Sequence, residues 1–364
     1  MNYVIERAEH RPAYLQLYIR VRDDIVNGVF PFNSKLPSKR MMADETGVST
    51  VTVEHAYDLL CDEGYIEPRQ RSGYFVIFNT DDGFARQSGG ASPKVQPVKQ
   101  PSNSLPDFPF STLAKTMRRV ISDYGEMILE RSPNAGCIEL REAIRNYLAQ
   151  SRGITAETEQ IIVGSGSEYL YSMIVELLGR ERVYAIESPS YKKIEMVYRA
   201  ADVQYEKLPL GRDGVESADL WACNADVLHL TPYRSFPTGV TATASKRHEY
   251  MRWAGTAGKY IVEDDFESEF SVSKKPEETL FSLSSEENVI YINTFSKTVS
   301  PSLRVGYMVL PKRLVPQFEE KVGFYSCTVP TYIQFVLAEM ISNGDFARHI
   351  NRVRRKKRSE LNAK

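Results

Sequence analysis

The chain has 364 residues, of which 42% are hydrophobic and 26% charged, a balance that excludes a disordered or fibrous protein and predicts two domains or one large one. Lys and Arg number 46 and Asp and Glu 47, so no overall positive charge attracts nucleic acid, and any such site must be local. No apolar run is long enough to span a bilayer, and the four scattered cysteines lack C-x-x-C spacing, so we expect a cytoplasmic protein with free buried thiols, no membrane span and no metal site.

The first 78 residues predict three helices followed by a hairpin. The segment "PAYLQLYIRVRDDIVNG" has apolar residues at helical spacing, and "LPSKRMMADETG" reads as a short second helix. In "VSTVTVEHAYDLLCDEGY" a third helix begins, with Ser49 as its N-cap. Two alternating apolar runs around a basic turn in "YIEPRQRSGYFVIF" are typical of a β-hairpin. This order predicts a winged helix-turn-helix domain over residues 1–78.

A winged helix-turn-helix presents its later helices and its hairpin to duplex DNA. Residues 1–78 contain nine Lys and Arg against eleven Asp and Glu, which taken alone argues against DNA. The basic residues gather, however, at the second helix and at the tip of the hairpin, where the duplex would lie. The predicted DNA contacts are Lys35, Ser38, Lys39, Arg40, Ser49, Thr50, Thr52, His55, Arg69, Arg71 and Gly73. The alternative is a small helical module that binds protein.

The motif order in this segment resembles the N-terminal domain of GntR-type bacterial regulators. The stretch "KLPSKRMMADETGVSTVTVEHAYDLLCDEGYIEPRQRSGYFV" contains L-P-S, G-V-S, A-Y-x-x-L, E-G-Y and S-G-Y-F-V in that family's order. The resemblance implies double-stranded operator DNA as a partner. The family usually carries a basic residue directly after G-V-S, where this chain has Thr50, so we expect a weaker contact at that position.

A composition change separates this first domain from the rest of the chain. Residues 79–107 are rich in Gly, Ser, Pro, Gln and Asn, which predicts a flexible linker. Beyond it, strands and helices alternate, with helices expected from Ser167 to Leu178 and from Ser190 to Ala201. The alternation predicts an α/β domain over residues 108–364, with a mostly parallel sheet and functional groups at the carboxyl ends of its strands.

Four polar elements of this second domain follow separate strands. The turn Gly164–Ser167 lies between a strand and a helix, where backbone N–H groups and the helix dipole bind anions. Asp264 ends one apolar strand, Tyr191 follows another, and Lys297 follows a third in "NTFSKTVSPSLR". Pyridoxal phosphate needs these groups: an amine for a Schiff base, an anion cradle, a carboxylate for the pyridine nitrogen and a flat side chain against the ring. Taken alone, a lysine in this position is normally a solvated loop residue, and only the other three elements favour a cofactor role. The predicted cofactor contacts are Lys297, Asp264, Tyr191, Ser165, Gly166, Ser167, Thr294, Ser296 and Arg304.

The order of these elements resembles the large domain of fold-type I aminotransferases, in the form fused to GntR heads, the MocR-type regulators. The stretches "TPYRSFPTG", "VEDDFESEF" and "NTFSKTVSPSLRVGYMVLP" carry the resemblance, which runs from about Asp107 to the end of the chain. It implies pyridoxal phosphate as cofactor, with Lys297 as its Schiff-base lysine, Asp264 on the pyridine nitrogen and Arg304 at the phosphate. It also implies a homodimer with cofactor pockets near the subunit interface.

Three departures from the family pattern favour sensing over catalysis. Phe266 stands where the family usually has a tyrosine, and "ERSPNAG" lacks the tyrosine that usually reaches the partner's phosphate. The small C-terminal domain, whose arginine usually binds an amino-acid carboxylate, is expected to be missing beyond the basic run Arg352 to Arg358, itself expected to be a solvated helix face. We predict a transcription regulator that uses pyridoxal phosphate on Lys297 to sense an amino compound or the cofactor itself. The alternatives are an aminotransferase with an accessory head, and a truncated product that folds poorly.

Overall fold

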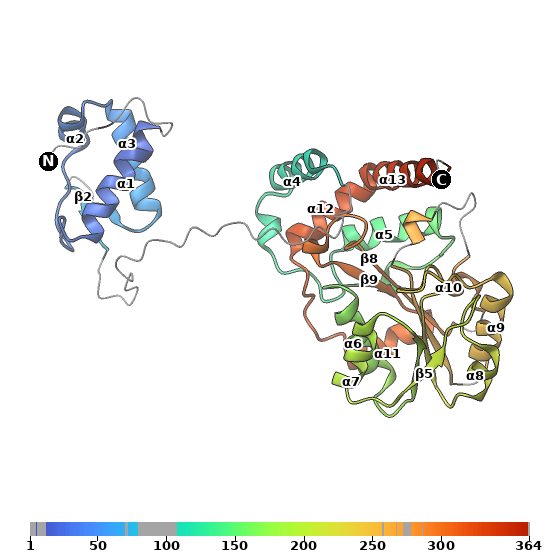
Figure 1. Cartoon of the computed structure of the whole chain (residues 1–364). Helices are drawn as coiled ribbons and strands as arrows, with labels where there is room; N and C mark the ends of the chain where they lie inside the picture. The colour runs from blue at the N-terminus through green and yellow to red at the C-terminus, as the bar shows by residue number, and fades with distance from the viewer. Residues whose placement is uncertain are drawn as a thin grey trace. The chain divides into compact units, whose positions relative to one another are not determined.

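The computed structural model describes residues 5, 12–69, 72–78, 108–256, 258–266, 268–271, 278–285 and 287–362. The chain divides into two compact units, Met1–Val98 and Lys99–Lys364, which are described separately below as the head and the body (Figure 1). The predicted linker, residues 79–107, lies outside the described residues, and so does Arg71. The predicted domain boundaries therefore stay predictions.

The head contains the three helices and the hairpin that the sequence predicts. The helices are α1 (Ala13–Val26), α2 (Lys39–Thr46) and α3 (Thr50–Asp62), and the strands β1 (Ile66–Arg69) and β2 (Gly73–Val76) pair antiparallel. Ser38 and Ser49 cap α2 and α3, because their hydroxyls accept hydrogen bonds from the backbone N–H groups of Met41 and Thr52 at 3.2 and 3.1 Å. The apolar faces of the three helices pack with the hairpin in one buried core.

A seven-stranded sheet forms the centre of the body. Its strands are β3 (Ile161–Gly164), β4 (Tyr184–Ser188), β5 (Tyr205–Pro209), β6 (Val227–Leu230), β7 (Tyr260–Asp264), β8 (Val289–Thr294) and β9 (Gly306–Val309). The order is β3-β9-β8-β7-β6-β4-β5. Only β9 runs antiparallel to its neighbours, so the predicted mostly parallel sheet is confirmed.

Helices cover both faces of this sheet, as a parallel sheet requires (Figure 1). One face carries α6 (Ser167–Leu178), α7 (Lys192–Ala200) and α11 (Val315–Lys321). The other carries α5 (Ile138–Ser151) and α12 (Thr331–Ser342), flanked by α4 (Phe110–Tyr124) and α13 (Asp345–Asn362), and beside them α8 (Ser217–Ala222), α9 (Ala244–Ala254) and α10 (Leu280–Leu283). Short 3₁₀ helices span Gly125–Leu129, Thr158–Gln160, Ser268–Phe270, Pro301–Leu303 and Lys312–Leu314. Alternate residues of β8 point to opposite cores: Ile290 and Ile292 join the α6 side and Tyr291 the α12 side.

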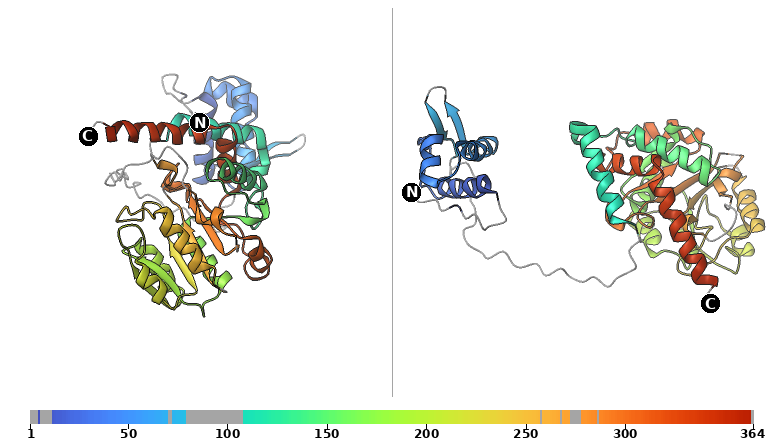
Figure 2. Two further views of the ribbon diagram at one scale, coloured as in Figure 1. Left: turned by 90° about the vertical axis from the view of Figure 1, so that its right-hand side faces the viewer. Right: turned by 90° about the horizontal axis from the view of Figure 1, so that it is seen from above.

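Three smaller sequence predictions concern surface and solvent. The long helix α13 runs along the outside of the body (Figure 2), and Arg352 and Arg355 are exposed on it, as a solvated basic face requires. All four cysteines are free thiols, but only Cys137 is fully buried. Within the described ranges, no helix is long and apolar enough to cross a membrane.

Candidate functional site

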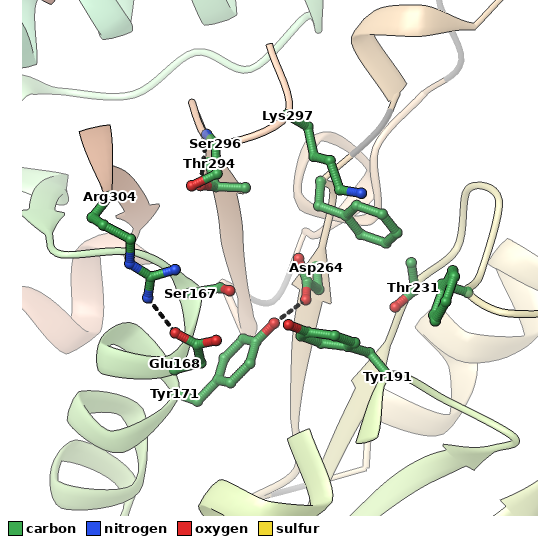
Figure 3. Close-up of a pocket in the computed structure, with 12 residues that line it drawn as sticks. Ser167, Glu168, Tyr171, Tyr191, Thr231, Asp264, Thr294, Ser296, Lys297 and Arg304 are labelled. Carbon is green, nitrogen blue, oxygen red and sulfur yellow. Dashed lines mark hydrogen bonds and ion pairs between the residues drawn. The ribbon is translucent and has the colours of Figure 1, made fainter. Parts of the chain in front are cut away.

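A pocket opens at the carboxyl ends of the parallel strands of the body (Figure 3). Its cavity volume is about 170 Å³, and the pocket is partly open to solvent. Its walls come from the start of α6 and from the segments that follow β4, β6, β7 and β8. The lining residues are Ser167, Glu168, Tyr171, Tyr191, Thr231, Phe236, Asp264, Phe266, Thr294, Ser296, Lys297 and Arg304. Segments more than a hundred residues apart meet here because parallel strands end at one edge of the sheet.

Lys297 lies in the turn that follows β8. The turn is held in place because Phe295 and Val299, on either side of the lysine, are buried in the core. The Nζ atom of Lys297 lies 6.0 Å from the centre of the Phe266 ring, and its side chain points into the space bounded by Asp264 and Tyr191 (Figure 3). Lys297 therefore lines the pocket, while the residue itself is exposed. An accessible amine at the pocket wall fits this placement, and its role as the Schiff-base lysine stays a prediction.

Asp264 is the last residue of β7 and is buried. Its Oδ2 atom accepts a hydrogen bond from the Tyr171 hydroxyl and lies 3.8 Å from Nε2 of His229. Burial and the neighbouring Asp264 carboxylate raise the pKa of Tyr171. The Tyr171 hydroxyl therefore stays protonated and donates a hydrogen bond to Asp264. The other oxygen, Oδ1, is buried without a hydrogen-bond partner among the residues that the structure describes. A buried acceptor without a partner costs free energy, so this atom is available to a donor bound in the pocket.

The start of α6 and Arg304 form the side of the pocket suited to an anion. Gly166 precedes α6 with a φ of 100°, and a Cβ there would stand 3.1 Å from Nη2 of Arg304. Glycine therefore lets the guanidinium approach the backbone at the helix N-terminus, where N–H groups attract negative charge. The hydroxyls of Thr294 and Ser296, 3.0 Å apart, lie on the same side.

A carboxylate of the protein already forms ion pairs with the positively charged side chains of this region. Glu168, in the first turn of α6, forms ion pairs with both Arg304 and Lys193. Partial burial acts to raise the pKa of Glu168, but hydrogen bonds from Lys193 and Arg304 outweigh it and lower the pKa. Glu168 is therefore ionised at neutral pH.

In the head, the residues predicted to contact DNA lie on the surface, and several of them also have structural roles. Lys35, Ser38, Arg40, Ser49, Thr50, His55, Arg69 and Gly73 are exposed, and Lys39 and Thr52 are half-buried. Lys39 Nζ pairs with Glu54 at 2.6 Å, and Arg69 Nε pairs with Glu67 at 2.8 Å. A Cβ on Gly73 would stand 3.1 Å from Cε of Lys35, so the lysine side chain lies beside the hairpin next to its turn.

Comparison with known proteins assigns both units. The gntR family of bacterial regulatory proteins matches residues 13–76, and the class I and II aminotransferases match residues 101–363. YdeL, an uncharacterized HTH-type transcriptional regulator of Bacillus subtilis, is 32% identical over 361 residues, covering 96% of this chain and 78% of YdeL. MocR, a probable rhizopine catabolism regulatory protein of Rhizobium meliloti, is 32% identical over 375 residues, covering 97% of this chain and 76% of MocR. The chain belongs to the MocR-type GntR regulators.

The body of this MocR-type regulator has the fold of the fold-type I aminotransferases. A kynurenine aminotransferase of Pyrococcus horikoshii superposes with a TM-score of 0.63 at 25% identity, over 70% of this chain and 66% of that one. The predicted resemblances of head and body, and the α/β fold class, are therefore confirmed. The head of the regulator is the helix-turn-helix domain of a DNA-binding family.

The structure brings most of the predicted cofactor residues of the regulator together. Lys297, Asp264, Tyr191, Ser167, Thr294, Ser296 and Arg304 line one pocket, whereas Ser165 and Gly166 form the turn behind it without lining it. Sequence reasoning missed Glu168, Tyr171, Thr231 and Phe236 as lining residues. Two of these had a signal: Tyr171 stands one helical turn after Ser167 on the same face of α6, and Thr231 directly follows the buried strand β6.

A buried acid next to the pocket predicts a pH-dependent stability. Glu187 lies on β4, where Ser235 Oγ donates a hydrogen bond to its Oε2 at 2.6 Å, and burial raises the pKa of Glu187 to about 8. A raised folded-state pKa gives stability that is fully present below the unfolded-state pKa and is lost as the pH rises through about 8. We expect Glu187→Gln, which mimics the protonated acid, to remove a slope of up to about 1.4 kcal/mol per pH unit between pH 5 and 8.

The free energy of unfolding is measured in urea at several pH values, with tryptophan fluorescence as the signal. Both tryptophans, Trp221 and Trp253, lie in the body, so the signal reports on that unit. Glu319→Gln, at an exposed position on α11, is the matched control and leaves the slope as in the wild type. Equal slopes for the wild type and Glu187→Gln would contradict a protonated Glu187.

Proposed function

We propose that this regulator binds operator DNA through its head and pyridoxal phosphate in the body pocket, where the cofactor senses an amino compound or its own concentration. One observation carries the proposal: the buried Oδ1 of Asp264 lacks a partner among the described residues, in the same pocket as the Lys297 amine and the Arg304 guanidinium. An acceptor, an amine and a cation are the groups that match a pyridine N–H, an aldehyde and a phosphate.

Different residues of the pocket would bind different groups of this cofactor. Pyridoxal phosphate, when bound, supplies an aldehyde that condenses reversibly with primary amines. Lys297 would provide the resident amine, and Oδ1 of Asp264 would accept the ring N–H. The Tyr191 ring provides a flat surface, while Arg304 and the N-terminus of α6 hold negative charge.

A sensing role is favoured over catalysis by one position in the pocket. Phe266 follows Asp264 on the pocket wall and offers no hydroxyl to a cofactor oxygen. The second candidate function, an aminotransferase with an accessory head, predicts repeated turnover of amino acids with a keto acid. A sensor instead predicts a spectral change without sustained product formation, so a turnover assay separates the two.

The body surface supports a homodimer. Large apolar side chains are exposed on α4, directly after α4, and in a loop that is hydrogen-bonded to the segment after α4. They are Phe110, Ile121, Met127, Leu129, Phe324 and Tyr325. Apolar exposure of this kind is typical of a contact surface. Two heads in a dimer would bind two half-sites of an operator, and an amino compound would shift the dimer between two states. Such a role places the protein in the cytoplasm with the DNA.

A mobility-shift experiment tests the DNA part of the proposal. Arg69 is exposed on the hairpin, beside the predicted position of the phosphate backbone. We expect Arg69→Ala in the full chain to weaken binding to duplex DNA roughly tenfold and to reduce the salt slope by about 1, as for one lost phosphate contact. Arg180→Ala, which removes an exposed arginine from the body, is the control and leaves binding unchanged. Equal effects of the two substitutions would contradict the assignment of the hairpin.

A further inference from the structure

The anion side of the pocket contains its own negative charge. Glu168 uses its Oε2 for Arg304 and its Oε1 for Lys193, and Figure 3 shows the Arg304 pair at the pocket wall. The Glu168 side chain is 23% exposed, whereas its two cationic partners are each about half exposed. The carboxylate is therefore held between two cations, and it does not extend freely into solvent.

Besides the two cations, the N-terminus of α6 stabilises the Glu168 carboxylate. It lies in the first turn of α6, where the helix dipole and free N–H groups stabilise negative charge. A phosphate bound beside Gly166 and Arg304 would draw on the same dipole and the same guanidinium. The carboxylate and a phosphate cannot both have the full benefit of Arg304, and two anions placed together repel each other.

We propose that the Glu168 carboxylate competes with the phosphate group of the cofactor for Arg304. Before the phosphate can bind, Glu168 must release Arg304 and stay paired with Lys193. This inference rests on the proposed function, since it concerns the affinity of the same pocket for pyridoxal phosphate. Competition weakens binding, so the cofactor is held reversibly and occupancy follows its concentration. A regulator that senses pyridoxal phosphate itself needs such reversible occupancy.

The second partner of the carboxylate makes the exchange feasible. Because Lys193 binds the other oxygen, Glu168 does not have to give up both ion pairs when Arg304 turns to the phosphate. Lys193 therefore favours cofactor binding without touching the cofactor. In the Lys193→Met variant Glu168 depends on Arg304 alone, so we expect binding about threefold weaker than in the wild type.

Titration of the full chain with pyridoxal phosphate and with pyridoxal, followed by absorbance, tests the proposal. We expect Glu168→Gln to lower the Kd for pyridoxal phosphate by about tenfold, because a like charge beside the phosphate is removed. Its Kd for pyridoxal, which lacks the phosphate, stays unchanged. Glu176→Gln is the matched control, since Glu176 lies on the same helix and forms an exposed ion pair with Arg180, just after the helix end. It alters neither value. In the Glu168→Gln background, Lys193→Met no longer weakens binding.

The outcomes separate the inference from the proposed function. If the wild type binds pyridoxal phosphate and Glu168→Gln binds it no more tightly, the competitor role is refuted and the proposed function stands. If Glu168→Gln tightens pyridoxal and pyridoxal phosphate equally, the effect does not concern the phosphate, and the inference is again refuted. If neither protein binds pyridoxal phosphate, both the proposed function and the inference fail.

Discussion

The Lys297→Ala variant is expected to lose covalent capture of pyridoxal phosphate completely. Wild-type protein mixed with the cofactor should develop a visible absorption band that borohydride removes, and the variant should show none. Loss of the only amine lining the pocket, within the part of the chain that the structure describes, should also weaken binding by roughly 100-fold, or about 2.7 kcal/mol. Phosphate and ring contacts remain in the variant, so weak non-covalent binding persists.

A matched lysine makes this result specific. Lys192 is exposed at the start of α7, next to Tyr191, and does not line the pocket. Lys192→Ala should therefore keep the full absorption band and the wild-type affinity. A band of equal strength in Lys297→Ala would mean that surface lysines react with the cofactor, and it would remove the basis of the proposed sensor.

Replacing Arg152 should produce the largest loss of stability in the body. Its guanidinium is buried at the end of α5, 2.6 Å from Oδ2 of Asp265, to which Tyr291 also donates a hydrogen bond at 2.8 Å. Both side chains of the ion pair are at most 5% exposed. Arg152→Met would leave the Asp265 carboxylate buried without its counter-charge, which typically costs about 3–5 kcal/mol.

Urea unfolding followed by the fluorescence of the body's tryptophans measures this change. The double variant Arg152→Met with Asp265→Leu is the control, because replacing both members of a buried pair by apolar residues is often nearly neutral. We expect it to recover most of the lost stability. A loss below about 1 kcal/mol for Arg152→Met alone would correspond to an exposed pair and contradict the buried arrangement.

The sequence predicted the local structure around the cofactor site for identifiable reasons. The Ser49 cap of α3 and the bounds of α6 follow from capping chemistry and from the change from a strand to a helical pattern. Lys297, Asp264 and Tyr191 could be placed in one pocket before the structure was known, because each follows a strand of a mostly parallel sheet.

The direction of β9 was not predicted, although a signal exists. Only residues 295–305 connect β8 to β9, and this segment is short for the crossover that a parallel pair requires. An antiparallel pair is therefore the simpler solution. The short connection also keeps Lys297 and Arg304, near its two ends, in the lining of one pocket.

The contacts of the polar side chains depend on distances between elements that no local pattern encodes. The Tyr171 hydroxyl reaches Asp264 across 93 residues of sequence, and Arg304 reaches Glu168 across 136. Such pairs are fixed by the packing of α6 on the sheet, which involves the whole core of that face. The competing carboxylate of Glu168 was for this reason invisible in the sequence.

The most direct test of the account locates the amine that captures the cofactor. Wild-type protein is incubated with pyridoxal phosphate near equimolar concentration, reduced with borohydride, digested and examined by peptide mass spectrometry. We predict one phosphopyridoxyl group per chain, on the peptide that contains Lys297. Label spread over surface lysines, or an unlabelled Lys297 peptide, would contradict the claim that this pocket holds the cofactor.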